Sequence, residues 1–190
     1  MTNRFKRVII YIMQPMILGL DISTSKIGIA LLDDEKVLLH SNLIKFKRKD
    51  MTLEEKAEHF MIVMDKYKTK GNIKNVYIEQ PFIAFGGGKT TAHTMAKLQR
   101  FNGMCCYGLY CLYGVAPTLI QANKARGLCG IKIKRGEKAK EKVIEWVSQT
   151  YPDSFTYDLT RHGNPKPGTD DMADAVVIAT AAWKLLKENI

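Results

Sequence analysis

Four carboxylates stand at the ends of apolar runs in this sequence, and together they restrict the folds that the chain can adopt. Asp21 and Glu79 each end a run of residues typical of a buried strand. Asp171 and Asp174 are three residues apart, and Asp174 precedes an apolar stretch typical of a buried helix face. A carboxylate removed from water is costly unless it is paired or binds a cation. The fold must therefore bring two strand ends and one helix together around a cation.

Oxygen ligands of this kind favour a hard divalent ion, and we expect Mg²⁺, with Mn²⁺ as a substitute. In phosphoryl chemistry such acids hold two ions about 3.5 to 4 Å apart, one activating the attacking water and the other stabilising the leaving 3′ oxygen. An N-cap or a surface position would explain any one of these acids alone, above all Asp170 or Asp171. All four in these contexts indicate a nuclease metal site, with Asp170 as a possible further ligand.

The charge of the chain favours a nucleic-acid partner. The sequence has 29 Lys and Arg against 19 Asp and Glu, a formal net charge of +10, and a pI of about 9.4. A solvated helix is the ordinary explanation of a basic run, but the excess over the whole chain favours a surface that faces phosphates. The basic residues gather between 124 and 142: Lys124, Arg126, Lys132, Lys134, Arg135, Lys138, Lys140 and Lys142.

The hydrophobic pattern predicts an α/β domain with a mixed five-stranded sheet flanked by helices. Three strands form an antiparallel meander, and two more alternate with helices. Thr52 and Glu55 form a predicted capping box at the start of the first helix, which ends at Gly71. The predicted strands are 16–20, 27–32, 36–47, 75–78 and 117–121, and the predicted helices are 52–70, 90–113, 136–150 and 169–187.

We expect one domain over residues 16–190, preceded by an extension or alternative start at 1–15. The apolar run at 8–13 is too short to span a bilayer and lacks a signal-peptide cleavage site, so we expect no membrane association. The four cysteines have no ligand spacing and are expected to be reduced core residues. These features predict a cytoplasmic protein, in the host cell if the gene belongs to a phage.

Three motifs resemble the acidic motifs of the RuvC family of Holliday junction resolvases, in order and at similar spacing. They are Leu18–Asp21, Ile78–Phe82 and Asp171–Ala175, within a resemblance over about residues 16–187. The first motif is common to many ribonuclease H-like and actin-like proteins, whereas the second and third together are more specific. The resemblance implies a ribonuclease H-like fold and a Mg²⁺-dependent homodimer. It also implies symmetric nicking of four-way DNA junctions, with 5′-phosphate and 3′-hydroxyl ends.

By this resemblance Asp21, Glu79, Asp171 and Asp174 are the catalytic, metal-binding acids. Phe82 matches an aromatic residue that stacks on junction bases, and stacking of this kind is worth about 1 to 3 kcal/mol per base. Lys140 matches a lysine at the start of a family helix. Lys124 or Arg126 lies near another basic family position, one residue out of register. The helix over 90–113 corresponds to the dimer interface.

Two further sequence features lie near the acidic motifs. Gly88, Lys89 and Thr90 are reminiscent of a P-loop, but Ile83 stands where that motif needs glycine. A glycine loop that lets the backbone and Lys89 approach DNA is the better interpretation. His162 precedes the last helix and could assist proton transfer, although a solvated loop histidine is the simpler alternative.

Other functions compete with a resolvase. A ribonuclease H-like, YqgF-type enzyme that processes RNA shares the first motif, but the basic segment and Phe82 fit branched DNA better. An actin-like or sugar-kinase phosphate loop around residues 21–25 would need two comparable domains, for which 190 residues are too few. A nucleic-acid-binding module without activity would not need all four acids.

Overall fold

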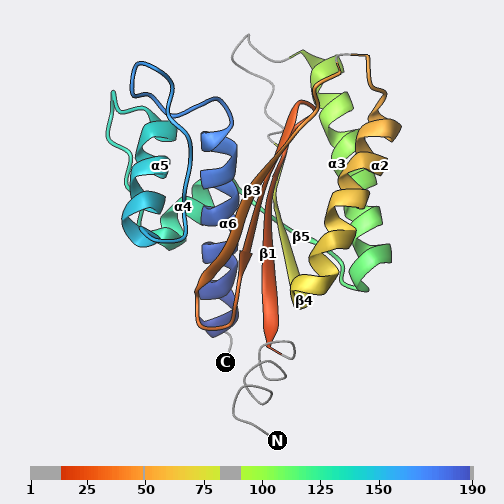
Figure 1. Cartoon of the computed structure of the whole chain (residues 1–190), viewed down its shortest axis with the longest axis horizontal. Helices are drawn as coiled ribbons and strands as arrows, with labels where there is room; N and C mark the ends of the chain where they lie inside the picture. Colours follow the sequence, from red (N-terminus) through yellow and green to blue (C-terminus); the bar gives the residue numbers. More distant parts are fainter. Residues whose placement is uncertain (1–13, 49, 82–90, 189–190) are drawn as a thin grey trace, which may run out of the picture.

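A computed structural model describes residues 14–48, 50–81 and 91–188 of the chain. A five-stranded sheet lies at its centre, with helices on both faces (Figure 1). In chain order the elements are β1 (Pro15–Ile22), β2 (Lys26–Leu32), β3 (Leu38–Lys45), α2 (Leu53–Asp65), the 3₁₀ helix η1 (Lys66–Lys70), β4 (Asn72–Glu79), α3 (Ala92–Tyr113), β5 (Thr118–Ile120), α4 (Ala122–Cys129), α5 (Ala139–Thr150) and α6 (Thr169–Glu188).

The sheet has the order β3-β2-β1-β4-β5. β1, β2 and β3 form an antiparallel meander, because short turns join them, whereas β4 and β5 run parallel to β1 after helical connections. The predicted meander and the mixed five-stranded sheet are therefore confirmed.

Alternation along the strands divides the core into two parts. Met16, Leu18 and Leu20 of β1 pack in one cluster with residues of α2 and α3. Ile17 faces the other way, into a cluster formed with α4, α5 and α6. The sheet is thus buried on both faces, which explains why its central strands read as continuous apolar runs in the sequence.

One extra residue interrupts the pairing of β1 with β4. Met16 is paired with Ile73, but Ile17 is paired with Asn75, so the register shifts by one residue at Lys74. Ile73 and Val76 consequently lie in the same cluster although they are three residues apart. Beyond this bulge the two strands stay in step to their ends.

Helix boundaries follow local sequence signals. The Thr52 side chain accepts a hydrogen bond from the Glu55 backbone N–H, and the Glu55 side chain accepts one from the Thr52 N–H, as the capping box predicts. Gly71, at φ 152°, follows η1, where the predicted helix ends. The sequence did not predict α4. It is only eight residues long and buries only Ala125 and Cys129, so it is too short to show a repeated helical period.

The cysteines are free thiols, and Cys105 and Cys129 are buried as expected. Cys111 is exposed on α3, so the prediction of a core position is wrong for that residue. None of the helices in the described part of the chain has the length and hydrophobicity needed to cross a bilayer.

Candidate metal centre

Asp21 and Glu79 lie side by side because β1 and β4 are neighbouring parallel strands. The register pairs Gly19 with Tyr77 and Leu20 with Ile78, so the next residue on each strand is an acid. Asp21 has the same strand parity as Ile17 and Gly19, which face α6. Both carboxylates therefore leave the sheet on the side that α6 covers.

Two glycines allow α6 to approach the sheet closely at this point. A Cβ atom at Gly19 would lie 2.5 Å from the carbonyl oxygen of Ala175, and one at Gly28 would collide with the backbone of Asp171. Gly28 is the partner of Asp21 in the pairing of β1 with β2. The first turns of α6 therefore lie directly over Asp21, and Asp174 is positioned to meet it.

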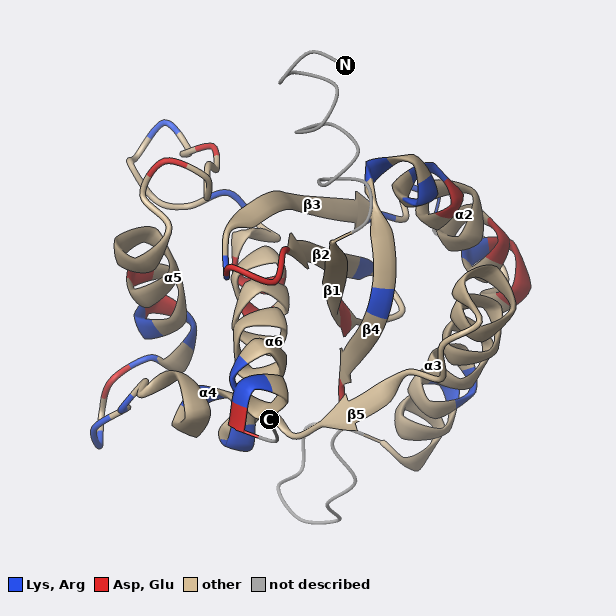
Figure 2. Ribbon diagram, turned by 90° about the horizontal axis from the view of Figure 1, so that it is seen from below, with Lys and Arg blue, Asp and Glu red and all other residues tan. Residues whose placement is uncertain are grey.

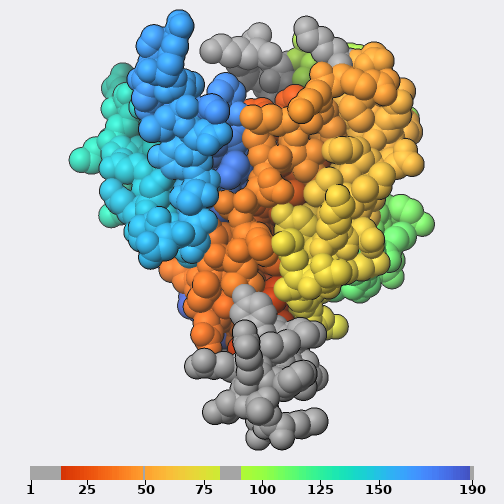
Figure 3. Space-filling view, in the orientation of Figure 1, coloured from red at the N-terminus to blue at the C-terminus, as the bar shows by residue number. Residues whose placement is uncertain are grey.

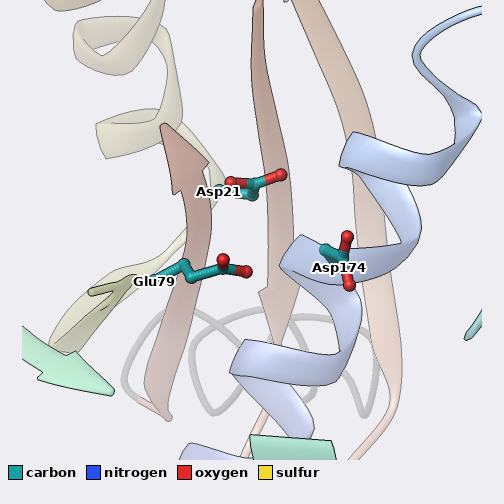
Figure 4. A group of neighbouring side chains, drawn as sticks. All are labelled: Asp21, Glu79 and Asp174. Carbon is teal, nitrogen blue, oxygen red and sulfur yellow. The ribbon is translucent and has the colours of Figure 1, made fainter. Parts of the chain in front are cut away.

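Asp21, Glu79 and Asp174 form what we call the carboxylate triad. One oxygen atom of each lies within 4.8 Å of those of the other two, and the three side chains point toward one another (Figure 4). They come from three separate elements that the core fixes in place. Carboxylate oxygens are the ligands that Mg²⁺, Mn²⁺ and Ca²⁺ prefer, so these residues fit a hard divalent cation.

Burial and mutual repulsion disfavour the ionised forms of the three triad carboxyl groups. Burial and then the charges of Glu79 and Asp174 raise the pKa of Asp21 well above its ordinary value. Burial and the charge of Asp174 raise the pKa of Glu79 to about 7, although Arg126 acts in the opposite direction. Burial also raises the pKa of Asp174, again against Arg126. A bound cation would remove this mutual repulsion.

The other two predicted acids have lysine partners. Asp171 forms an ion pair with Lys26 of β2, and Asp170 forms one with Lys140 at the start of α5. Burial would raise the pKa of Asp170, but the hydrogen bond and charge of Lys140 hold it at about 2. Neither acid belongs to the triad, so a role for Asp171 or Asp170 in metal binding stays a prediction.

Sequence reasoning missed Lys26 as a residue of this site. A basic side chain that begins an otherwise apolar strand was the available signal, but its partner on α6 is 145 residues away. Strand pairing decides the contact, because Lys26 has the same parity on β2 as Gly28, which α6 covers. The pairing could not be read from the local sequence.

Two of the predicted basic residues reach the acids. Arg126 of α4 donates to Asp174 through Nη2 at 3.4 Å, while its buried Nε has no hydrogen-bond partner among the described residues. Lys140 contacts Asp170, so the starts of α5 and α6 lie next to each other. Lys124, Lys132, Lys134, Arg135 and Lys138 are exposed, four of them in the stretch between α4 and α5, where Figure 2 shows basic residues gathered.

The structure places one of the three remaining predicted residues, His162. Phe82 and Lys89 lie outside the described residues. His162 is exposed, and its Nε2 accepts a hydrogen bond of 2.9 Å from Arg161.

A cavity of about 480 Å³ lies between β3 and the segment that precedes α6, along the seam between the orange and blue surfaces in Figure 3. Its lining includes residues 156–158 and 166–167.

Comparison with solved structures identifies the fold. Thermus thermophilus RuvC in complex with a Holliday junction substrate matches with a TM-score of 0.66 and 16% identity, covering 91% of this chain and 95% of that chain. A second T. thermophilus RuvC structure has a TM-score of 0.61 and 14% identity, covering 92% and 96%. The yeast mitochondrial Holliday junction resolvase Ydc2 has a TM-score of 0.61 and 13% identity, covering 97% and 85%.

No family model matches the sequence, and no curated protein sequence matches it. The similarity is therefore one of three-dimensional structure. It extends over most of this chain and most of each resolvase chain. It confirms the ribonuclease H-like fold that the three acidic motifs predicted.

Proposed function

We propose that this chain is a metal-dependent, structure-selective DNA endonuclease that resolves four-way junctions by paired nicks. The observation that carries the proposal is the triad. Three carboxylates from three elements converge within 4.8 Å in a fold that matches a junction-bound RuvC over 91% of the chain. A scaffold role would not require three half-buried acids to face one another, because their repulsion destabilises the metal-free protein.

The proposed chemistry is hydrolysis of a phosphodiester. Mg²⁺ ions, two per site with Mn²⁺ as a substitute, would supply an activated water and stabilise the 3′ oxygen that leaves. Asp21 and Glu79, fixed on neighbouring strands, orient the reacting groups from the sheet, and Asp174 does so from α6. The water oxygen bonds to phosphorus, the bond to the 3′ oxygen breaks, and the proton ends on that oxygen. The products are 5′-phosphate and 3′-hydroxyl ends.

Basic residues around the triad support DNA as the substrate. The net charge of +10 attracts a polyanion, and the exposed residues Lys132, Lys134 and Arg135 lie just before α5, whose start contacts the start of α6. Contacts with phosphates are sequence-independent, as recognition of a branched shape requires. Phe82 and Lys89 are proposed as additional DNA contacts on the family pattern.

A homodimer would supply the second active site that paired nicking needs. On α3, Tyr107 is 71% exposed and Tyr110 is 53% exposed, which is high for aromatic residues on a helix. The helix that carries them corresponds to the dimer interface in the resemblance. Sedimentation at micromolar concentration should give about twice 21.5 kDa, and a monomer would contradict paired nicking.

The decisive experiment compares three end-labelled substrates of equal length: a four-way junction, a linear duplex and an RNA–DNA hybrid. We expect nicks at symmetric positions in the junction with Mg²⁺ or Mn²⁺, and none with EDTA. The linear duplex should be cut much more slowly. Equal cleavage of junction and duplex would contradict the proposal, and preference for the hybrid would favour a YqgF-type ribonuclease instead.

A further inference from the structure

Lys26 of β2 pairs with Asp171, which lies three residues before Asp174 of the triad on α6. It begins β2, and its Nζ contacts Oδ2 of Asp171. The two side chains are only 27% and 13% exposed, so solvent screens their charges little. The second lysine–acid pair, Lys140 with Asp170, differs because the Lys140 side chain is 74% exposed.

Asp171 lies within electrostatic reach of the whole triad. Its charge raises the pKa values of Asp21, Glu79 and Asp174. Its backbone lies directly against β2, because a Cβ atom at Gly28 would collide with the Asp171 carbonyl. Only the side-chain rotamer remains free, and two alternatives compete for it: the ammonium of Lys26 or a cation shared with the triad.

We propose that Lys26 is a positioning residue that holds Asp171 away from the triad, so that the site binds one divalent ion tightly and a second only when Lys26 releases Asp171. This inference rests on the proposed function. An arriving DNA phosphate is the natural trigger, because its negative charge offers the Lys26 ammonium another partner. The complete metal site would then form only on a bound substrate, which protects other phosphodiesters from attack.

The test measures binding of Mn²⁺ alone to the DNA-free protein, by calorimetry and by the EPR signal of free Mn²⁺. We expect the wild type to bind one ion tightly per chain. Lys26→Met and Lys26→Gln, which both lack the ammonium, should bind a second ion, with overall affinity about tenfold higher because a nearby positive charge is gone. Lys26→Arg should behave as the wild type does.

Lys45→Met is the matched control. Lys45 is the β3 partner of Lys26 in the sheet register, but it is exposed, so its loss changes the net charge equally without freeing Asp171. It should leave the number and affinity of the ions unchanged. In an Asp171→Asn background, Lys26→Met should lose its effect on the second ion, because Lys26 acts through that carboxylate.

The outcomes separate the two proposals. If the wild type binds Mn²⁺ but Lys26→Met and Lys26→Gln match it in number and affinity, the role of Lys26 is refuted while the nuclease proposal stands. If the wild type binds no divalent ion and cuts no junction, both proposals are refuted. Circular dichroism in EDTA confirms that each variant is folded before titration.

Discussion

The two ends of the contact between α6 and β1 have opposite chemistry. At one end Ile17 and Gly19 pack against the apolar, alanine-rich part of α6, where Gly19 touches Ala175 and Ala179. At the other end, two residues further along β1, Asp21 meets Asp174 and the acid from β4. The same helix and the same strand build both ends.

The difference shows how a fold can hold like charges together. Close packing at the apolar end fixes the distance between α6 and β1. The acids at the other end are therefore held close together despite their repulsion. The pKa values of all three carboxyl groups are raised, because burial and this distance disfavour their ionised forms. Changes at the charged end should therefore have the larger effect on cleavage, and changes at the apolar end should alter both cleavage and stability.

The largest effect is expected from neutralising the charged end. Glu79→Gln and Asp174→Asn should each lower the rate of junction cleavage by about 10³-fold or more, because a metal ligand is lost. Binding to the junction in EDTA should persist, since removing a negative charge lessens repulsion of phosphate. Loss of binding together with cleavage would show instead that these acids are structural.

The next effect concerns pH and the metal-free protein. The pKa of Glu79 is about 7 in the fold against 4.5 ordinarily, so its contribution to stability is complete below about pH 4.5 and is lost as the pH rises through 7. The free energy of unfolding in EDTA should fall by about 3 kcal/mol across this range relative to Glu79→Gln. Urea denaturation at several pH values checks this difference, and saturating Mn²⁺ should remove the fall in the wild type, because a bound cation favours the ionised carboxylate. Equal pH dependence of the two proteins would contradict the predicted repulsion.

A change at the apolar end should have a smaller effect, on both properties. Gly19→Ala forces α6 away from β1 and should destabilise the protein by about 2 kcal/mol, with reduced cleavage because Asp174 moves. Gly127→Ala on α4 is the control, since a Cβ there meets nothing within 4 Å and a helical alanine is favourable. Chemical denaturation of both variants gives the comparison. If Gly19→Ala were as stable as Gly127→Ala, the contact would not set the helix position.

The smallest effect is expected far from the acids. The hydroxyl of Tyr151 lies 2.9 Å from that of Thr180, which also donates to the carbonyl of Val176. Tyr151→Phe removes one buried hydrogen bond and should cost about 1 kcal/mol in stability. Cleavage at saturating Mg²⁺ should be unchanged. A large loss of activity would show that this hydrogen bond is coupled to the acids through α6.

Much of the fold could be predicted because its signals are local. Apolar runs and turn residues specify β1, β2 and β3, and the Thr52 capping box specifies the start of α2. The short helix α4 could not be predicted, because its eight residues are too few to repeat a helical period.

The candidate site was predictable to a similar degree. Asp21, Glu79 and Asp174 each interrupt an apolar run, which marks them as costly to bury. The ion pairs of Asp170 and Asp171 depend on strand register and helix packing, over separations of 30 and 145 residues. No local pattern distinguishes these two neighbours, and only the arrangement of α5, α6 and β2 assigns each a different lysine.

The bulge at Lys74 makes β4 unequally tolerant of changes in length. Removing Lys74 would leave Ile17 opposite Asn75, so Glu79 would keep its place beside Asp21. Removing Tyr77 would instead set Glu79 opposite Leu20 and turn it toward the core formed with α2 and α3. A single-residue deletion would thus leave the triad intact at one position and would remove Glu79 from it three residues later, although both positions lie in the same strand.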